Sequence, residues 1–304
     1  MKQTPMVLGT VQLGMNYGIA NCAGKPSEEK SFSILRAALE NGVTTLDTAR
    51  AYGNSEEVIG KFLKTWDGAV PNIVTKIPKL QGSTPKELTA FAVSCMEESL
   101  DRLGVSKVSA VMLHGAKDPA IHGAACADAM KTLLDLGYTD RVGVSVYTGE
   151  DIRKMLPYDV FSVTQVPMSI FDQQLLTDGS IQALQHAGYT VYVRSVFLQG
   201  LFFLDPDNIT DPLLKEYAVP YIRKLRRLAA ELHMTVAQLA IAFIRDQSGI
   251  SGLVLGADTP EQVENNLSCF ATPQLTADTI ALLNEEFNRV DIPQIMKVLS
   301  RPKK

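Results

Sequence analysis

The sequence lacks the marks of a membrane protein, a secreted protein and a multidomain chain. No apolar run reaches the length of about 18 residues that spans a bilayer, and the opening MKQTPMVLG does not have the form of a signal peptide. No Gly/Ser/Pro-rich linker or low-complexity repeat divides the 304 residues, of which 46% are hydrophobic. We therefore expect one soluble, cytoplasmic domain over residues 1–304, with no membrane partner.

Cysteine and histidine are scarce, at four residues each. The cysteines are far apart and form no CxxC pair, which predicts reduced residues that serve mostly in packing. His122, His186 and His233 fall in loop or helix patterns, and the spacing from His114 to His122 matches no metal-ligand pattern. The sequence therefore predicts no metal site. The cysteines are Cys22, Cys95, Cys126 and Cys269.

The sequence also has no excess of positively charged residues. The formal net charge of −4 argues against a nucleic-acid partner. The one basic cluster lies at helical spacing among Ile222, Leu225 and Leu228, which predicts the solvated face of an amphipathic helix. The members of this cluster are Arg223, Lys224, Arg226 and Arg227.

What the sequence does contain is a regular alternation of strand and helix patterns. Predicted helices that begin with a capping Ser or Thr include Ser27–Asn41, Thr84–Gly104 and Thr259–Ser268. Eight buried, continuous apolar strands separated by helices predict an α/β fold, a closed parallel (β/α)8 TIM barrel. The strand-like runs are Met6–Gly9, Val43–Asp47, Asn72–Lys76, Val108–His114, Arg141–Ser145, Phe161–Val166, Tyr189–Arg194 and Gly252–Leu255.

Polar residues stand at the ends of these runs, where TIM barrels carry their reacting groups. Asp47 ends the second run, and Tyr52 lies in the loop after it. Lys76 ends the third run and His114 the fourth. A Tyr beside a Lys that is paired with an Asp can donate a proton to a carbonyl oxygen. Taken singly, the four residues could equally be a turn residue, a rim aromatic, a solvated strand end and a half-buried loop residue. The four later runs end at or next to Ser145, Gln165, Arg194 and Gly256.

The usual glycine fingerprints of nucleotide binding, GxGxxG after a strand and GxxxxGK[ST], are absent, so a dinucleotide would need another cradle. The string DTARAYGNSE, with Lys76 and His114, resembles the Asp, Tyr, Lys and His pattern of the aldo-keto reductase family. The resemblance continues through MVLGTVQLG, GVSVY, QVPMSIFD, VRSVFLQGLF and VLGADTPEQVENN, over nearly the whole chain. It implies an oxidoreductase that uses NADP or NAD for carbonyl reduction.

The resemblance implies a role for each of the four polar residues. Tyr52 would be the general acid, and the Lys76 cation would lower the pKa of its phenol from about 10 by roughly 1–3 units. Asp47 would orient Lys76 and offset its charge. His114 would hydrogen-bond the carbonyl oxygen and stabilise developing alkoxide character.

The resemblance also implies a cofactor groove. Ser145 and Gln165 would hold the nicotinamide carboxamide, and Arg194 would lie along the ring or a nearby phosphate. Many relatives have Asn after the Ser of GVS, whereas this chain has Val146, so one carboxamide hydrogen bond is missing or comes from elsewhere. Each of these residues also has an alternative, purely structural role. Ser145 could cap the next turn, Gln165 could satisfy backbone groups, and Gly256 could form a tight bend. The strap over the diphosphate would contain Ser195, Phe197 and Gly200, and the adenosine end Gly256, Gln262 and Asn266.

The choice between NADP and NAD stays open at this point. Relatives selective for NADPH often carry Lys or Arg after the eighth strand, because the 2′-phosphate needs a cation. This chain has Asp258, Glu261 and Glu264 there, which favours NADH or the use of both cofactors. The resemblance itself favours NADPH, because NADPH is the more frequent cofactor in the family.

The leading hypothesis is an enzyme that reduces an aldehyde or ketone, sugar-derived compounds included, to an alcohol. The alternatives are an auxiliary or redox-sensor subunit that binds cofactor with little turnover, and a cofactor-free lyase or isomerase with a Schiff base on Lys76. The physiological substrate, the oligomeric state and the role of the tail after Val290 stay open. Loop residues that could line a substrate pocket are Asn16, Tyr17, Tyr147, Met168, Phe171 and Phe197.

Overall fold

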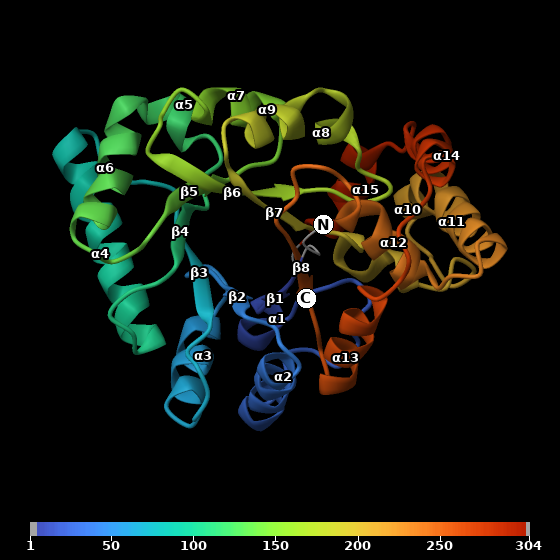
Figure 1. Ribbon diagram of the computed structural model, residues 1–304, viewed down its shortest axis with the longest axis horizontal. Helices are drawn as coiled ribbons and strands as arrows, with labels where there is room; N and C mark the ends of the chain where they lie inside the picture. The colour runs from blue at the N-terminus through green and yellow to red at the C-terminus, as the bar shows by residue number, and fades with distance from the viewer. Residues whose placement is uncertain (1–4, 302–304) are drawn as a thin grey trace.

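The computed structural model describes residues 5–301, and within them eight parallel strands close into a barrel (Figure 1). Each strand pairs with the next one in the sequence, and the register from Met6↔Leu253 to Gly9↔Gly256 joins the first strand to the last. The predicted TIM barrel is therefore confirmed. The strands are β1 (Met6–Gly9), β2 (Thr45–Asp47), β3 (Asn72–Ile77), β4 (Ala110–Leu113), β5 (Val142–Ser145), β6 (Phe161–Pro167), β7 (Thr190–Arg194) and β8 (Gly252–Gly256).

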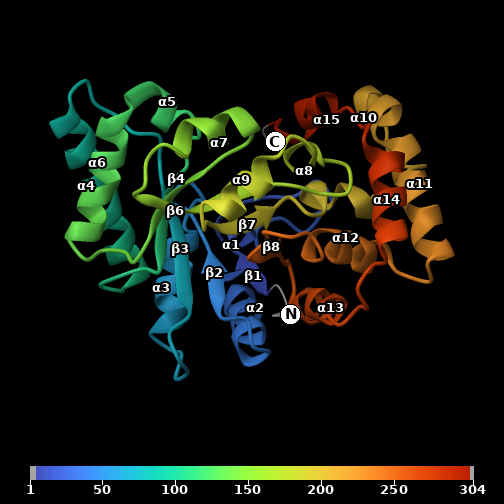
Figure 2. The same cartoon turned by 45° about the horizontal axis from the view of Figure 1, so that its top comes forward.

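Helices cover the outside of the barrel, as Figures 1 and 2 show. They are α1 (Val11–Gly14), α2 (Glu28–Glu40), α3 (Ser55–Leu63), α4 (Pro85–Leu103), α5 (Asp118–His122), α6 (Ala124–Asp135), α7 (Gly149–Met155), α8 (Gln174–Thr177), α9 (Ser180–His186), the 3-10 helix η1 (Leu198–Phe203), α10 (Pro212–Tyr217), α11 (Val219–Glu231), α12 (Val236–Arg245), α13 (Pro260–Cys269), α14 (Ala277–Phe287) and α15 (Ile292–Leu299).

The three helices predicted from their caps form with those caps. Ser27 accepts a hydrogen bond from the Lys30 N–H at the start of α2. Thr84 and Glu87 form a reciprocal capping box at the start of α4, and Thr259 caps α13. These caps satisfy N–H groups that the first helical turn leaves without partners, so they fix where each helix begins.

Four predicted strands begin later than expected, and the largest differences are at the runs that start at Val43 and Val108. The Val43 N–H donates to Ala38 O at 3.0 Å and closes the turn after α2, so β2 starts only beyond it. Val108 makes an isolated bridge to Thr139 ahead of β4. Val43 and Val108 are both buried in connections from a helix to a strand. A short apolar run alone does not distinguish such a buried connection from the strand that follows it.

The last described helix packs against the outer helices of the barrel. Residues 292–299 of the tail form α15, which packs on α10, and Arg301 Nη1 pairs with Asp211 Oδ2 at 2.6 Å. Figures 1 and 2 show α10, α11 and α14 together on one side of the molecule, beyond α12. Residues 302–304 of the tail lie outside the described residues.

Helix α11, on this side of the molecule, is amphipathic. Ile222, Leu225 and Leu228 of α11 are buried, whereas the side chains of Arg223 and Arg227 are 59% and 66% exposed, as expected for a solvated face. No single helix within residues 5–301 is long and apolar enough to cross a membrane. The helices α11 and α12 meet that criterion only as a pair, and they are bent by 88°.

Candidate active site

Four sequence-predicted residues, Asp47, Tyr52, Lys76 and His114, converge at the C-terminal ends of neighbouring strands. Asp47 is the last residue of β2, and Lys76 precedes the last residue of β3. His114 follows β4, and its backbone N–H donates to Ile77 O at 2.9 Å. Tyr52 stands in the short connection between β2 and α3. These four residues, called the catalytic cluster below, lie at the end of the barrel where TIM-barrel active sites are built.

The turn that carries Tyr52 is held by two glycines. Gly53 has a φ of +57°, and a Cβ at this position would lie 2.3 Å from Gly14 O. A Cβ on Gly14 would lie 1.7 Å from Tyr52 O. The backbone of α1 therefore packs directly on the Tyr52 turn, which only glycine at both positions allows.

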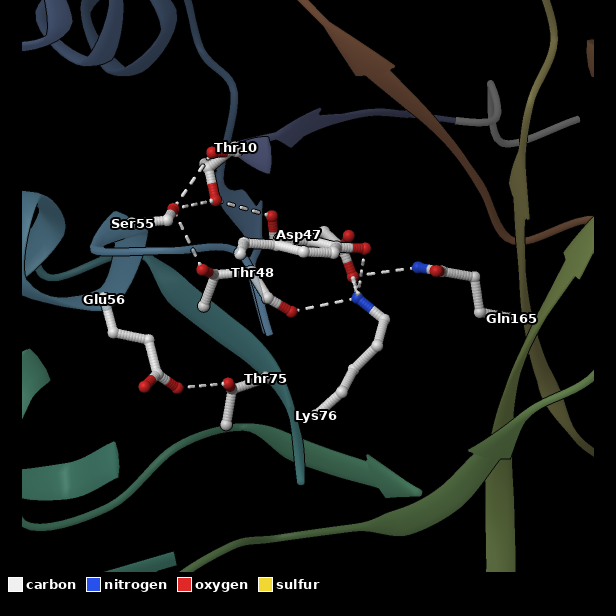
Figure 3. Close-up of polar contacts among 9 residues, drawn as sticks. Thr10, Asp47, Thr48, Ser55, Glu56, Thr75, Lys76 and Gln165 are labelled. Atoms are coloured by element: carbon white, nitrogen blue, oxygen red, sulfur yellow. Dashed lines mark hydrogen bonds and ion pairs between the residues drawn. The ribbon is translucent and has the colours of Figure 1, made fainter. Parts of the chain in front are cut away.

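Lys76 is the centre of the catalytic cluster, and its side chain is fully buried. Its Nζ donates to Asp47 Oδ1 at 2.6 Å and to Thr48 O at 2.9 Å (Figure 3), and it lies 3.5 Å from Tyr52 OH. An ammonium group has three N–H donors, so these three oxygens use all of them. Gln165 Nε2 donates to the same Asp47 oxygen at 2.8 Å. Asp47 and Lys76 thus form a buried ion pair that leaves no N–H donor of the ammonium free.

Hydrogen bonds behind the cluster support its backbone through residues that were not expected from the sequence. Thr10 Oγ1 donates to Asp47 O at 2.9 Å, and Ser55 Oγ lies 2.8 Å from Thr10 Oγ1 (Figure 3). Thr75 Oγ1 donates to Glu56 Oε1 at 2.6 Å. Ser55 and Glu56 belong to the DTARAYGNSE string, so their proximity to Tyr52 is the sequence signal that could have identified them.

The electrostatics of Tyr52 differ from the sequence-based expectation. Burial, and then the Asp47 carboxylate, raise the pKa of the Tyr52 phenol above its ordinary value of 10.0. Burial lowers the pKa of Lys76, although Asp47 opposes this shift. The expected lowering of the Tyr52 pKa is therefore wrong, because burial disfavours the phenolate and the Asp47 carboxylate, 2.6 Å from Lys76 Nζ, offsets the ammonium charge. Tyr52 is a protonated phenol at neutral pH.

His114 completes the cluster as a neutral imidazole. Its ring meets the Tyr52 ring edge to face, with centroids 5.9 Å apart and an interplanar angle of 83°. Burial, and then the charges of Lys76 and Arg194, lower the pKa of His114 to about 4. A neutral imidazole has one N–H donor and one acceptor nitrogen. The site thus holds two neutral groups, a phenol and an imidazole, that can both donate to one oxygen atom.

A cavity of about 640 Å³ runs from the catalytic cluster to the start of α13. Asp47 and Tyr52 line its catalytic end, and Asp258 lines its far end. Of the nine residues predicted to bind a cofactor, all except Ser145 line this cavity. They are Gln165, Arg194, Ser195, Phe197, Gly200, Gly256, Gln262 and Asn266.

Two buried oxygens at the catalytic end have no hydrogen-bond partner within residues 5–301. They are Ser145 Oγ and Gln165 Oε1, and the two residues are register partners in β5 and β6. A primary carboxamide carries both N–H donors and a C=O acceptor, so it can bond both the hydroxyl and the amide oxygen. Val146, in the place of the expected Asn, is fully buried, and its apolar side chain offers no hydrogen bond, whereas its backbone N–H donates to Gln165 O. The residues present fit the carboxamide of a nicotinamide.

The loops around the cavity are joined by contacts that the sequence did not reveal. In the loop after β7, Ser195 and Gln199 have φ values of 65° and 57°, which are uncommon for residues other than glycine. The Ile19 N–H donates to Gln199 O at 2.8 Å. Asn21 Nδ2 donates to Asp258 Oδ1 at 3.1 Å. The loop after α1 therefore contacts both the loop after β7 and the loop after β8.

The residues predicted for the adenosine end also bind their own backbone. Gln262 Oε1 accepts from the Asp258 N–H at 2.7 Å, and Asn266 Nδ2 donates to Gly256 O at 3.4 Å. A Cβ on Gly256 would lie 2.1 Å from Gln12 Nε2, so glycine makes room there for the Gln12 amide. These residues line the cavity while they also fix the local structure around α13.

The expected substrate-pocket residues divide into three groups. Tyr17 and Phe197 line the cavity. Met168 and Phe171 are 0% and 2% exposed and belong to the hydrophobic core, where the Phe171 ring stacks on Phe287 with centroids 5.2 Å apart. The prediction of Met168 and Phe171 as pocket residues is therefore wrong. The other two candidates, Asn16 and Tyr147, are exposed.

The thiols and histidines form no second site in the described part of the chain. Within residues 5–301, no group of three His, Cys, Asp or Glu side chains is arranged to hold a metal ion. All four cysteines carry free thiols, and three of them are buried in packing positions. The buried ones are Cys95, Cys126 and Cys269, and Cys22 is exposed.

Comparison with known proteins identifies the family. The Aldo/keto reductase family matches residues 5–286. The aldo-keto reductase YhdN of Bacillus subtilis is 26% identical over 263 residues, 79% of this chain and 78% of the relative. The NADH-specific methylglyoxal reductase of Escherichia coli is 24% identical over 268 residues, 75% and 78% of the two chains. The holo form of aldo-keto reductase AKR11C1 from Bacillus halodurans has a TM-score of 0.76 at 21% identity, covering 93% of this chain and 92% of that one.

The chain therefore belongs to the aldo/keto reductase family, as its sequence motifs predicted. It is an NAD(P)H-dependent oxidoreductase, and the family acts on small carbonyl compounds.

Proposed function

We propose that this protein reduces an aldehyde or ketone to an alcohol, with Tyr52 as the general acid. The observation that carries the proposal is the phenol of Tyr52, 3.5 Å from Lys76 Nζ in a buried cluster that opens onto the 640 Å³ cavity. A bound nicotinamide supplies a hydride to the carbonyl carbon. Tyr52 gives its O–H proton to the carbonyl oxygen, so a C–H and an O–H bond form as the C=O double bond becomes single.

The other members of the cluster position the reacting oxygen and the phenol. The raised pKa of Tyr52 keeps the phenol protonated, so it is ready to donate at neutral pH. His114, neutral because its pKa is about 4, donates an N–H to the same carbonyl oxygen. Lys76 holds the phenolic oxygen and is itself held by Asp47 at 2.6 Å. This arrangement stabilises negative charge on Tyr52 only as the proton leaves.

The cofactor lies along the cavity in this proposal. Ser145 and Gln165 bind the carboxamide through their two unpartnered oxygens, and Arg194 lies beside the ring. The loop after β7 provides the surface for the diphosphate through Ser195, Phe197 and Gly200, and the start of α13 receives the adenosine through Gly256, Gln262 and Asn266.

We propose further that NADH is used appreciably. Asp258 lines the adenosine end of the cavity, and Glu261 and Glu264 stand in the helix that begins there. A 2′-phosphate of about two negative charges would meet this carboxylate instead of the cation that it needs. The E. coli relative named as NADH-specific supports this choice.

The test is a titration with NADH and NADPH, followed by a panel of aldehydes and ketones monitored at the nicotinamide absorbance. The proposal predicts stoichiometric binding and turnover of at least part of the panel. Stoichiometric binding with negligible turnover across the panel would instead indicate an auxiliary or redox-sensor subunit. Trapping of a substrate on Lys76 with borohydride, without any need for cofactor, would indicate Schiff-base chemistry.

A further inference from the structure

Arg194 places a second cation at the catalytic end of the cavity. Its guanidinium uses far fewer of its N–H donors in hydrogen bonds than the Lys76 ammonium does. Its Nη2 lies 3.4 Å from Val146 O, and its Nη1 lies 3.5 Å from Ser195 Oγ. Both distances are long for N–H···O hydrogen bonds. None of the ion pairs formed within residues 5–301 includes Arg194. A guanidinium has five N–H donors, so most of its capacity is unused.

The direction of the Arg194 side chain places these unused N–H donors near the reacting groups. Arg194 ends β7 and is the register partner of Pro167 in β6. Its guanidinium reaches across β6 to the segment after β5, where it stacks over the Tyr147 ring with its Cζ 4.4 Å from the ring centroid. It thus lies beside the strand ends that carry Ser145 and Gln165.

The charges around Arg194 do not neutralise it by contact. Lys76 is paired with Asp47, and His114 is neutral at pH 7. The carboxyl group of Asp172, after β6, senses the charge of Arg194, but burial raises its pKa to about 6 and it forms no ion pair with the guanidinium. Among the described residues, the Arg194 guanidinium at the catalytic end of the cavity therefore has no anion in contact.

We propose that Arg194 binds an oxyanion carried by the substrate itself, a carboxylate or phosphate close to the reacting carbonyl. A planar guanidinium binds such a group through two parallel hydrogen bonds, and stacking on Tyr147 holds the plane in one orientation. Tyr17, which lines the same end of the cavity, provides a second neutral donor. The enzyme then selects acidic carbonyl compounds over neutral ones of the same size. This inference rests on the proposed function.

The diphosphate of the cofactor is the other oxyanion that could occupy Arg194. The geometry favours the substrate, because the guanidinium stacks on Tyr147 and lies 3.4 Å from Val146 O, in the segment that follows β5. Its charge acts on the titration of Tyr52, His114 and Tyr17, all of which belong to the catalytic end. The experiment below separates the two sources.

The first measurement compares kcat/KM for succinic semialdehyde and butanal, which share a four-carbon chain and differ in one carboxylate. We expect the acid to be preferred by roughly 10- to 100-fold, the range of a charge-assisted pair of hydrogen bonds. Arg194→Gln should bring the ratio close to one, and Arg194→Lys should restore part of it. The matched control is Arg141→Gln, which removes the same charge just ahead of β5, at the opposite end of the barrel.

The second measurement is calorimetric binding of succinate to the protein saturated with oxidised cofactor. Arg194→Gln should weaken succinate binding by tenfold or more, and Arg141→Gln should not. A wild-type substrate ratio near one, or equal losses for both aldehydes in Arg194→Gln, would overturn the inference. Tenfold weaker binding of both NADH and NADPH, with an unchanged substrate ratio, would assign Arg194 to the diphosphate.

Failure of the Arg194 inference and failure of the proposed function give different results. Reduction of both aldehydes with no preference overturns the role of Arg194 and leaves the reductase proposal intact. Absence of reduction with both aldehydes and with the whole panel of aldehydes and ketones overturns the reductase proposal, and the succinate titration still decides whether Arg194 binds a carboxylate.

Discussion

The two ends of the cavity are built in different ways. At the catalytic end, side chains from separate strands bond one another in the dry interior, as Lys76 does with Asp47 at 2.6 Å. At the adenosine end, Gln262 and Asn266 bond the backbone of their own segment, at Asp258 and Gly256. A buried charge pair that loses one partner is costly, whereas a surface contact to local backbone is replaced by water at little cost. Substitutions at the first end should therefore change chemistry and stability, and those at the second should change cofactor affinity alone.

Tyr52→Phe removes one oxygen atom from the catalytic end. This variant should show the largest difference between an effect on turnover and an effect on cofactor binding. We expect kcat for carbonyl reduction to fall by about 10²- to 10⁴-fold, because the proton donor is lost. The Kd values of both cofactors should stay within about threefold of wild type, since the cavity toward α13 is unchanged. Tyr138→Phe, which removes an exposed phenol bonded to Glu97, is the matched control. Turnover like wild type in Tyr52→Phe would remove Tyr52 from the reaction.

Lys76→Met should lower stability as well as turnover. The substitution leaves the Asp47 carboxylate buried without its cation, which costs about 3–5 kcal/mol of unfolding free energy. Urea denaturation measures this loss. The double variant Asp47→Asn/Lys76→Met removes both charges and should recover much of it, although its activity stays low. A single variant as stable as wild type would mean that Asp47 and Lys76 do not form a charged pair.

His114 should make stability depend on pH in a window below neutrality. Its folded-state pKa of about 4 lies under the ordinary value of 6.5, so the unfolded chain takes up a proton first as pH falls. The free energy of unfolding should therefore decrease between about pH 6.5 and pH 4. Urea denaturation at pH 7.5 and pH 5 should show a loss about 1–2 kcal/mol larger in wild type than in His114→Gln. Equal losses in the two proteins would show that the imidazole titrates normally.

The adenosine end should respond most weakly, and only in cofactor choice. Asp258→Arg should improve kcat/KM with NADPH relative to NADH by about 1–3 kcal/mol, if the new cation bonds the 2′-phosphate. Asp258→Asn separates this gain from an altered contact with Asn21, and Asp128→Arg on α6 controls for net charge. A wild type that already prefers NADPH by more than about a hundredfold, unmoved by Asp258→Arg, would place the phosphate on another loop.

The barrel was predictable because its signals are local. Strand-like runs and caps act within a few residues, and the caps Ser27 and Thr84 formed where expected. The strand starts near Val43 and Val108 were wrong, because a buried connection has the same composition as a strand. The motif around Tyr52 placed four side chains on one rim, since parallel strands bring their C-terminal ends together.

Other parts of the site depend on distances that no local pattern contains. The contact between Asn21 and Asp258 joins residues 237 positions apart, and Gln199 meets Ile19 through a backbone of positive φ. The direction of the Tyr52 pKa shift depends first on the burial of the phenol and then on the nearby Asp47 carboxylate, and spacing in the sequence gives neither. The sequence therefore predicted which side chains meet at this rim but not their electrostatic balance.

The most direct test of this account is a pH titration of Tyr52 in the folded protein. Tyrosine labelled with ¹³C at Cζ reports ionisation of each phenol, and Tyr52→Phe assigns the signal of Tyr52. Because burial and Asp47 raise the pKa of this phenol, its signal should stay that of the protonated form past the ordinary value of 10.0. A signal that titrates below pH 8 would contradict the account, since it would mean that the Lys76 charge acts on Tyr52 without being offset by Asp47.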